Sequence, residues 1–192
     1  MINVIETSIP GVVVIEPRVF GDARGYFLET WSQRDFNSLV RPVRFVQDNE
    51  SRSSYGVVRG LHFQKGKSSQ SKLVRVIEGR VLDVSVDIRR GSPTFGKYVA
   101  VELTGDSHRQ LFIPKGFAHG FAVLSDSALF QYKCDSFYDP SSEGSIAWDD
   151  PELGIDWHLP TEDIILSEKD KLAPRFRDAA ELFDFNIDYY AE

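Results

Sequence analysis

The chain has 192 residues, 42% of them hydrophobic and 27% charged, a composition that predicts one folded domain with a substantial core and argues against disorder. The formal net charge of −7 argues against general nucleic-acid binding, but it leaves room for a local basic pocket that holds a charged ligand. The sequence contains neither a signal-peptide pattern nor the roughly 20-residue apolar run of a membrane span, so we expect a cytoplasmic protein without membrane partners.

The predicted elements are mostly strands, and helical patterns occur only towards the two ends of the chain. A first helix is predicted over 32–39, and short strands follow over 73–77, 82–88, 97–103, 110–113 and 120–124. The strand over 82–88 alternates apolar with polar residues, which indicates one buried and one exposed face. Two short helices are predicted over 167–172 and 178–183. Glycines recur about every ten residues between the strands and no repeat or linker is visible, so residues 1–192 are expected to form one all-β domain, a jelly-roll-like sandwich or barrel with short peripheral helices.

Two of the four histidines, His62 and His119, lie beside glycines at the edges of β-patterned runs, where an imidazole can point into a pocket. A metal site in a β-barrel of this size usually contains a His-x-His pair, a nearby glutamate and a third histidine. His62 is followed by Phe63 and Gln64, so the pair is missing, and the remaining two histidines lie in polar, turn-like contexts. We therefore expect no functional metal. The plain alternative for His119 is a core histidine bonded to a backbone carbonyl.

Covalent catalysis has little support in the sequence. The single cysteine, Cys134, excludes an intrachain disulfide and a thiol-rich zinc site, and its β-like context predicts a buried, inert thiol. No serine lies in a nucleophile-elbow context, and no glycine-rich loop is suited to cradle a phosphate.

The remaining possibility is acid–base chemistry next to a ketone. Removal of a proton from such a carbon needs a base within reach and a cation or hydrogen bond that stabilises the enolate oxygen, and inversion needs an acid on the opposite face. His62 suits the base, Lys72 the cation and Tyr132 the acid. A carboxylate bonded to the far nitrogen of His62 would fix its tautomer, and Asp83, Asp87 and Asp170 are all candidates. Each residue also has an ordinary alternative: a solvated strand end for Lys72, a cross-strand aromatic pair for Tyr132 and a helix cap for Asp170.

Eight segments carry a family resemblance, and they follow one another in family order from about residue 10 to residue 172. They are Phe20–Glu29, Gln47–Asn49, Arg59–Gln64, Lys72–Val76, Asp87–Gly96, Ile113–Gly120, Tyr132–Cys134 and Leu166–Asp170. On these segments the chain closely resembles the dTDP-4-dehydrorhamnose 3,5-epimerase family of cupin-fold sugar-nucleotide epimerases. Two departures are mild. Phe63 stands where many relatives have tyrosine, and the loop over 65–69 is more basic and lacks the usual proline, which leaves open how the ligand is covered.

The resemblance implies a cofactor-free epimerase that converts dTDP-4-dehydro-6-deoxy-glucose to dTDP-4-dehydro-rhamnose. His62 would be the base, Tyr132 the acid, Asp170 the partner of His62 and Lys72 the enolate-stabilising cation. Tyr138 would stack on the thymine ring. The remaining residues implied to line the sugar-nucleotide site are Arg24, Glu29, Gln47, Asn49, Arg59, His119, Glu143 and Lys169.

The resemblance also implies a homodimer in which the N-terminal strand crosses to the partner and carries Arg24 and Glu29 to the neighbouring pocket. Three other readings stay open. The first is an epimerase that inverts only one carbon of a related deoxysugar. The second is a cupin that binds a nucleotide sugar without catalysis, which has no need of the His62, Lys72, Tyr132 and Asp170 set. The third is a metal-dependent cupin oxygenase, against which the missing His-x-His pair argues.

Overall fold

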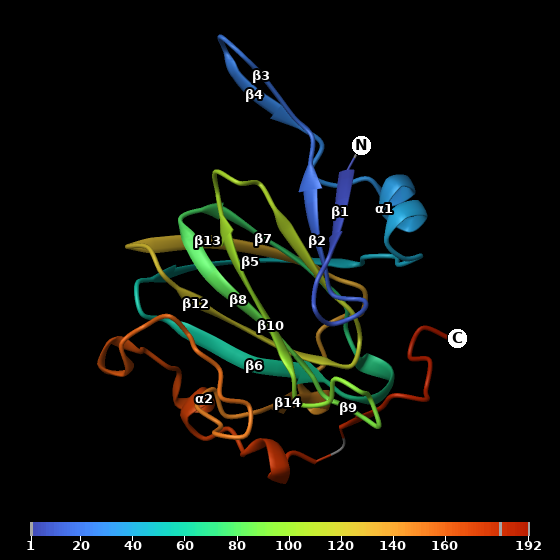
Figure 1. Ribbon diagram of the computed structural model, residues 1–192, viewed down its shortest axis with the longest axis vertical. Helices are drawn as coiled ribbons and strands as arrows, with labels where there is room; N and C mark the ends of the chain where they lie inside the picture. Colours follow the sequence, from blue (N-terminus) through green and yellow to red (C-terminus); the bar gives the residue numbers. More distant parts are fainter. Residues whose placement is uncertain (1, 181, 192) are drawn as a thin grey trace.

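The computed structural model describes residues 2–180 and 182–191, and two antiparallel sheets dominate it (Figure 1). The six-stranded sheet has the order β1 (Ile2–Glu6), β2 (Val13–Pro17), β11 (Gln110–Ile113), β7 (Lys72–Glu78), β13 (Ser127–Cys134) and β5 (Gln47–Ser54). The five-stranded sheet has the order β10 (Tyr98–Thr104), β8 (Arg80–Asp87), β12 (Phe117–Val123), β6 (Val58–Gln64) and β14 (Glu143–Ser145). The expected jelly-roll sandwich is confirmed, with two separate sheets rather than one closed barrel.

The two sheets enclose an apolar core made by every second residue of their strands. β7 contributes Val74 and Val76, β12 contributes Phe117 and Phe121, and β13 contributes Phe130, all at most 4% exposed. Because successive side chains of a strand point to opposite faces, residues two positions apart face the same interior. Lys72 lies two positions before Val74. His119 and Tyr132 lie two positions after Phe117 and Phe130. The polar side chains of the predicted site thus continue the inner face of the apolar core.

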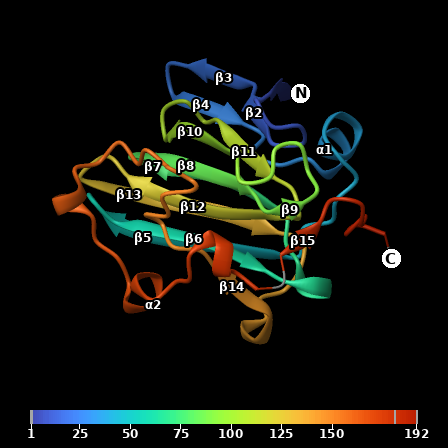
Figure 2. The ribbon, with the colours of Figure 1, turned by 60° about the horizontal axis from the view of Figure 1, so that its bottom comes forward.

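The outer faces of the sheets are covered by the helices and by the C-terminal part of the chain. Helix α1 (Gln33–Leu39), capped by the hydroxyl of Ser32, packs Phe36 against Phe112 on the six-stranded sheet. Trp157, Phe176 and Phe183 of the segment that follows β14 pack against residues of β6 and β8. Figure 2 shows the backbone of this segment, with α2, beside β6 and β14. This segment contains α2 (Glu168–Lys171) and the strand β15 (Phe183–Asp184), which pairs in parallel with β9 (Arg89–Arg90). The short 3₁₀ helices are η1 (Gly66–Ser68), η2 (Pro140–Ser142), η3 (Thr161–Asp163) and η4 (Phe176–Asp178).

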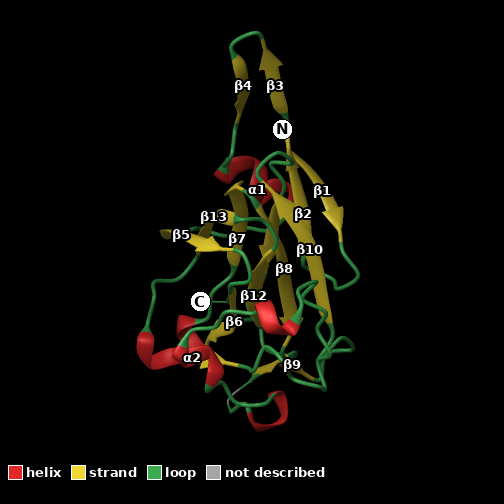
Figure 3. Cartoon of the chain, turned by 90° about the vertical axis from the view of Figure 1, so that its left-hand side faces the viewer, coloured by secondary structure: helices red, strands yellow, loops and turns green. Residues whose placement is uncertain are grey.

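The hairpin of β3 (Val19–Asp22) and β4 (Gly25–Leu28) extends beyond the rest of the molecule (Figures 1 and 3). Its aromatic side chains are largely exposed: Phe20 at 50%, Tyr26 at 63% and Phe27 at 69%. An extended apolar hairpin of this kind is typical of a surface that another chain covers.

The structure agrees with most predicted elements and corrects two of them. The helices at 32–39 and 167–172 are present as α1 and α2, and the five predicted strands are β7, β8, β10, β11 and β12. The helix predicted over 178–183 is wrong: Asp178 ends η4, Phe183 begins β15, the other described residues between them are irregular, and residue 181 lies outside the described part. The half-exposed strand predicted over 82–88 is also wrong. Every residue from 81 to 88 is buried, because the polar face of β8 turns into the interior and its apolar face lies under the C-terminal segment.

Candidate active site

His62 and His119 are partners across the β6–β12 ladder, where the two strands approach unusually closely. A β-carbon on Gly60 would lie 2.5 Å from the α-carbon of Gly120, so only glycine fits there. The φ angle of Gly60 is 127°, a region that other residues rarely adopt. The register shifts between His119 and Phe121 at this point. The glycines beside the two histidines therefore bring both imidazoles to one place in the interior.

The imidazole of His62 is hydrogen-bonded to a carboxylate supplied by α2. Nε2 of His62 lies 2.5 Å from Oδ1 of Asp170, and Asp170 is 4% exposed. The hydroxyl of Ser167 caps α2 and donates to Oδ2 of the same carboxylate at 2.8 Å, so both carboxylate oxygens have partners. Burial alone would raise the pKa of Asp170, but the hydrogen bond and charge of His62, with the bond from Ser167, hold it below its usual value. The carboxylate is thus placed to orient His62 and to stabilise its protonated form.

The second imidazole also has a carboxylate partner. Nε2 of His119 lies 2.9 Å from Oδ2 and 3.0 Å from Oδ1 of Asp83, and both residues are buried. Burial raises the pKa of Asp83 and lowers that of His119, while their attraction opposes both shifts. The alternative interpretation of His119, a bond to a backbone carbonyl, is wrong.

The three candidate aspartates have different partners. Asp170 bonds to His62, and Asp83 bonds to His119. Asp87 lies outside the site and accepts hydrogen bonds from Arg89, Ser92 and Thr94.

Lys72 and Tyr132 come from the opposite sheet. Nζ of Lys72 lies 5.7 Å from the centre of the Tyr132 ring. Burial lowers the pKa of Lys72, an effect that neighbouring acidic groups, Asp83 and Glu143 among them, partly offset. Burial raises the pKa of Tyr132 above 10, which keeps its hydroxyl protonated at neutral pH. A cation that is poorly solvated and a phenol that holds its proton lie side by side, facing the histidines of the other sheet.

Cys134 is buried as predicted, and burial raises the pKa of its thiol to about 11. It is the strand partner of Lys72 in the β13–β7 ladder, and the side-chain amide of Asn49 lies 3.9 Å from its sulfur. The thiol is therefore part of the wall behind Lys72 and carries no thiolate at neutral pH.

The remaining predicted site residues make polar contacts with one another and with neighbouring side chains. Tyr138 is 56% exposed and its hydroxyl bonds to Glu143, which also forms an ion pair with Lys169, the neighbour of Asp170. Gln47 donates to the side chain of Asn49 at 3.0 Å on β5. Arg59 donates to the hydroxyl of Ser53 at 3.1 Å.

Arg24 and Glu29 are the two predicted site residues that the structure does not bring to the others. Arg24 lies at the tip of the β3–β4 hairpin, where it pairs with Asp22 two residues away, and its side chain is 89% exposed. Glu29 follows the same hairpin and is exposed. Within one chain these two residues are remote from His62.

Sequence reasoning named Asp83 only as a candidate partner of His62, whereas the structure pairs it with His119. It did not name Ser167, which holds Asp170, although the Ser-x-x-Asp spacing of a helix start was a usable signal. Within residues 2–180 and 182–191, no group of three or more His, Cys, Asp and Glu side chains is arranged to hold a metal ion. No helix in the described part of the chain is long and apolar enough to cross a membrane.

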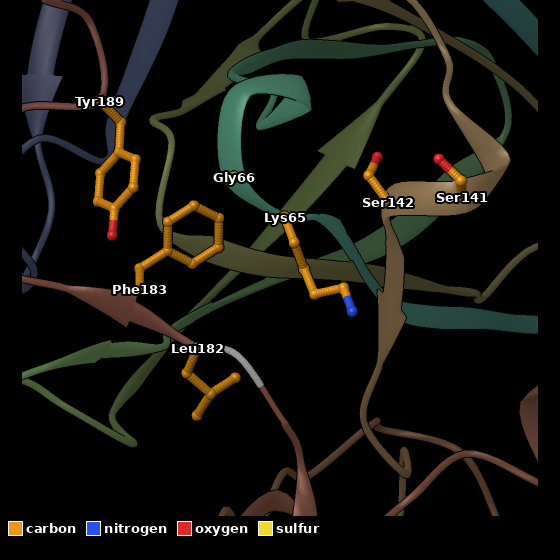
Figure 4. Close-up of a pocket in the computed structure, with 7 residues that line it drawn as sticks. All are labelled: Lys65, Gly66, Ser141, Ser142, Leu182, Phe183 and Tyr189. Carbon is orange, nitrogen blue, oxygen red and sulfur yellow. The ribbon is translucent and has the colours of Figure 1, made fainter.

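A separate pocket of about 480 Å³ lies outside this site (Figure 4). It is lined by Lys65, Gly66, Ser141, Ser142, Leu182, Phe183 and Tyr189, none of them a predicted site residue. Figure 4 shows the loop of η1 and the turn of η2 on neighbouring sides of it.

Comparison with known proteins places this arrangement in a family. The family model described as dTDP-4-dehydrorhamnose 3,5-epimerase matches residues 6–178. Two similar relatives carry that name. The protein of Salmonella typhimurium is 54% identical, over 91% of this chain and 95% of its own length. That of Escherichia coli is 55% identical, over 88% and 91%.

A solved structure agrees with both relatives. The dTDP-6-deoxy-D-glucose-3,5-epimerase of Legionella pneumophila, crystallised with dTDP-4-keto-L-rhamnose, is 49% identical. It superposes with a TM-score of 0.93 over 97% of this chain and 100% of its own. The jelly-roll sandwich with its interior polar site is thus that of a sugar-nucleotide epimerase. The chain belongs to the dTDP-4-dehydrorhamnose 3,5-epimerase family, as the sequence resemblance predicts.

Proposed function

We propose that the protein catalyses the 3,5-epimerisation of dTDP-4-dehydro-6-deoxy-D-glucose to dTDP-4-dehydro-L-rhamnose, in the cytoplasm and without a cofactor. One observation carries the assignment of roles: His62 and Tyr132 project into the same interior from opposite sheets. Inversion of a carbon needs proton removal on one face of the sugar ring and proton delivery on the other. A base and an acid on facing sheets meet that requirement.

The chemistry follows from the C4 ketone, which acidifies the protons on both C3 and C5. His62 takes the proton, and the electron pair of the broken C–H bond moves into the enolate, whose negative charge collects on the C4 oxygen. Lys72 stabilises that oxygen, and its burial strengthens the interaction because little water screens it. Tyr132 then donates its proton to the carbon from the opposite face. Asp170 keeps the imidazole oriented and stabilises the imidazolium between the two transfers.

The mouth of the site suits a nucleoside diphosphate. Tyr138 offers an exposed ring for the thymine, and Arg59 and Lys169 offer positive charge for the diphosphate. Gln47, Asn49, His119 and Glu143 provide further hydrogen-bonding groups around the sugar. This local grouping allows a protein of net charge −7 to bind a dianionic ligand.

We further propose that the active form is a homodimer, each chain folding as one domain over 1–192. The support is the exposed aromatic hairpin of β3 and β4, together with the distance of Arg24 and Glu29 from the site of their own chain. If the hairpin reaches over the partner subunit, its apolar surface is buried and both residues complete the neighbouring pocket.

Deuterium labelling tests the reaction directly. The protein is incubated in deuterated water with dTDP-4-dehydro-6-deoxy-D-glucose, and the product is trapped with a rhamnose-forming reductase and analysed by NMR. We expect deuterium at both C3 and C5, because each inverted carbon receives its new proton from solvent-exchangeable groups. Label at only one carbon would identify a single-carbon epimerase, and binding without any label would identify a nucleotide-sugar binder.

A further inference from the structure

The backbone around Tyr138 is held on both edges by glutamine side chains. Oε1 of Gln47 accepts from the backbone N–H of Tyr138 at 3.0 Å. On the other edge, Nε2 of Gln64 donates to the carbonyl oxygen of Phe137 at 3.1 Å, and Oε1 of Gln64 accepts from the N–H of Asp139 at 2.8 Å. One primary amide thus pairs with the peptide groups before and after Tyr138, as a neighbouring strand would. The exposed ring of Tyr138 therefore stands on a backbone that two side chains fix.

Both N–H groups of the Gln64 side-chain amide are engaged in hydrogen bonds. Gln64 is 4% exposed, and its Nε2 donates to the carbonyl of Ser68 at 2.7 Å as well as to Phe137. Two carbonyls face the nitrogen and one N–H faces the oxygen, so only one orientation of the amide satisfies all three groups. Loss of the amide would leave part-buried backbone groups of two loops without partners.

The same residue joins the basic loop around η1 to the loop that carries Tyr138. Besides the Gln64 bonds, the hydroxyl of Ser68 donates to Oδ2 of Asp139 at 2.8 Å, and the N–H of Lys65 donates to the carbonyl of Ser142 at 2.8 Å. Gln64 lies on β6, two residues after His62, with its side chain on the same face of the strand. Strand β6 therefore carries both His62, the proposed proton acceptor, and Gln64, which positions the ring proposed to stack on the nucleobase.

We propose that Gln64 is a positioning residue for recognition of the nucleobase: it holds the backbone of Tyr138 so that the ring is preformed to stack on thymine. This inference rests on the proposed function, because it takes Tyr138 as the ring that meets the base. A preformed ring lowers the ordering cost of binding, so Gln64 contributes to nucleotide affinity and not to proton transfer.

The test compares Gln64→Met, which keeps the length of the side chain and removes all three bonds, with the wild type. The affinity for dTDP is measured by calorimetry, and kcat and KM are measured for the dehydro-sugar nucleotide. We expect Kd and KM to rise about tenfold, the scale on which base–aromatic stacking acts, while kcat changes less than about twofold. Gln33→Met is the control: Gln33, the first residue of α1, also donates to a backbone carbonyl, that of Val43, and among the described residues it makes no bond to the Tyr138 segment, so its loss should leave Kd and KM unchanged.

A double-mutant cycle separates positioning from general damage to the fold. In the Tyr138→Ala background, Gln64→Met should change the Kd for dTDP by less than about twofold, because the ring through which Gln64 acts is gone. An undiminished effect in that background, or a fall in kcat with unchanged KM, overturns the inference. If Gln64→Met does not fold, Gln64→Glu keeps the acceptor for Asp139 and removes both donors when ionised, and the same cycle applies. A wild-type protein that fails to bind dTDP overturns the proposed function as well, whereas a wild type that binds it while Gln64→Met binds equally well overturns the inference alone.

Discussion

Oδ1 of Asp170 lies 2.5 Å from Nε2 of His62, although 108 positions separate the two residues in the chain. The carboxylate is also held from its other side by Ser167 at the start of α2, so both of its oxygens are fixed. A negative charge fixed in this way selects the tautomer of His62 that leaves the other nitrogen free to accept a proton.

Asp170→Asn should therefore fold normally and lose most of its turnover. The amide keeps the shape of the side chain but no longer stabilises the imidazolium, so we expect kcat to fall by about two orders of magnitude or more with little change in KM. Steady-state kinetics and a thermal melt measure the two effects. Asp87→Asn is the matched control: Asp87 anchors Arg89, Ser92 and Thr94, so its loss should lower Tm by about 5 °C and leave kcat near the wild-type value. Asp170→Asn with normal turnover would show that His62 needs no carboxylate.

A deuterium-exchange experiment should distinguish the role of His62 as base from that of Tyr132 as acid. His62→Ala should neither invert the sugar nor wash deuterium into it, while its Kd for dTDP stays near that of the wild type, because the residues proposed to bind the nucleotide are intact. Tyr132→Phe keeps the ring and its packing beside Phe130 but removes the proton donor. It should still exchange substrate protons with deuterated water while inversion falls sharply. Inversion by Tyr132→Phe at the normal rate would assign the acid to another group.

The activity should decline at alkaline pH because of Lys72. Its cationic form stabilises the enolate, and burial lowers its pKa below the usual value of about 10.4, so activity is lost as pH rises through that lowered pKa. Tyr132 cannot produce this decline, because burial raises its pKa. A kcat profile from about pH 6 to pH 10 should show the decline in the wild type and not in Lys72→Arg, whose side chain stays charged. In Tyr132→Phe the rate of deuterium exchange, which that variant keeps, should show the same decline. If Lys72→Arg also lost activity at alkaline pH, the loss would be due to the titration of a different group.

The same shift gives a prediction for stability. The pKa of Lys72 is lower in the folded state than in the unfolded state, so the unfolded chain binds the proton more tightly and the charge opposes folding at neutral pH. This destabilising effect of the Lys72 charge disappears as the pH rises from the lowered pKa of the folded state to the ordinary pKa of the unfolded chain. Lys72→Met should therefore raise Tm at pH 7 while almost abolishing turnover, which a thermal melt and an activity assay determine together. A lower Tm would mean that interactions of the ammonium group outweigh its burial.

Mixing two inactive variants tests the exchanged hairpin. Arg24→Ala should be inactive or nearly so because the partner's pocket lacks its arginine, and His62→Ala because its own base is missing. In a mixed dimer, one pocket has both His62 and the partner's Arg24, so co-refolding equal amounts should restore about one quarter of the wild-type rate. Each variant refolded alone serves as the control. No recovery, with mixed dimers demonstrated by mass, would place Arg24 at the pocket of its own chain. An active Arg24→Ala variant would place Arg24 outside catalysis.

Alternation of apolar and polar residues was enough to locate the central strands. The strands over 73–77 and 110–113 and the helix capped by Ser32 appear where local pattern predicts them, because face and capping depend on neighbours within a few positions. The polar strand β5 has no such pattern. Its residues from Gln47 to Ser54 include no apolar side chain, and only Ser53 among them is buried. The helix predicted over 178–183 failed because pairing of Phe183 with Arg89 on β9 outweighed local propensity.

The residue types of the site, and the family to which they point, were determined by the sequence alone: a histidine, a lysine and a tyrosine beside glycines in an otherwise apolar β pattern. The residue pattern left the partner of His62 open among three aspartates, although the family resemblance implied Asp170. That Asp83 meets His119 was decided only by the tertiary structure. Asp83, Asp87 and Asp170 are equivalent as residue types, but the β8–β12 register sets Asp83 against His119, and the docking of α2 sets Asp170 against His62. Alternation of apolar and polar residues tells which face of a strand a residue occupies. Its partner across a sheet or on a distant helix depends on strand register and on packing between segments far apart in the chain.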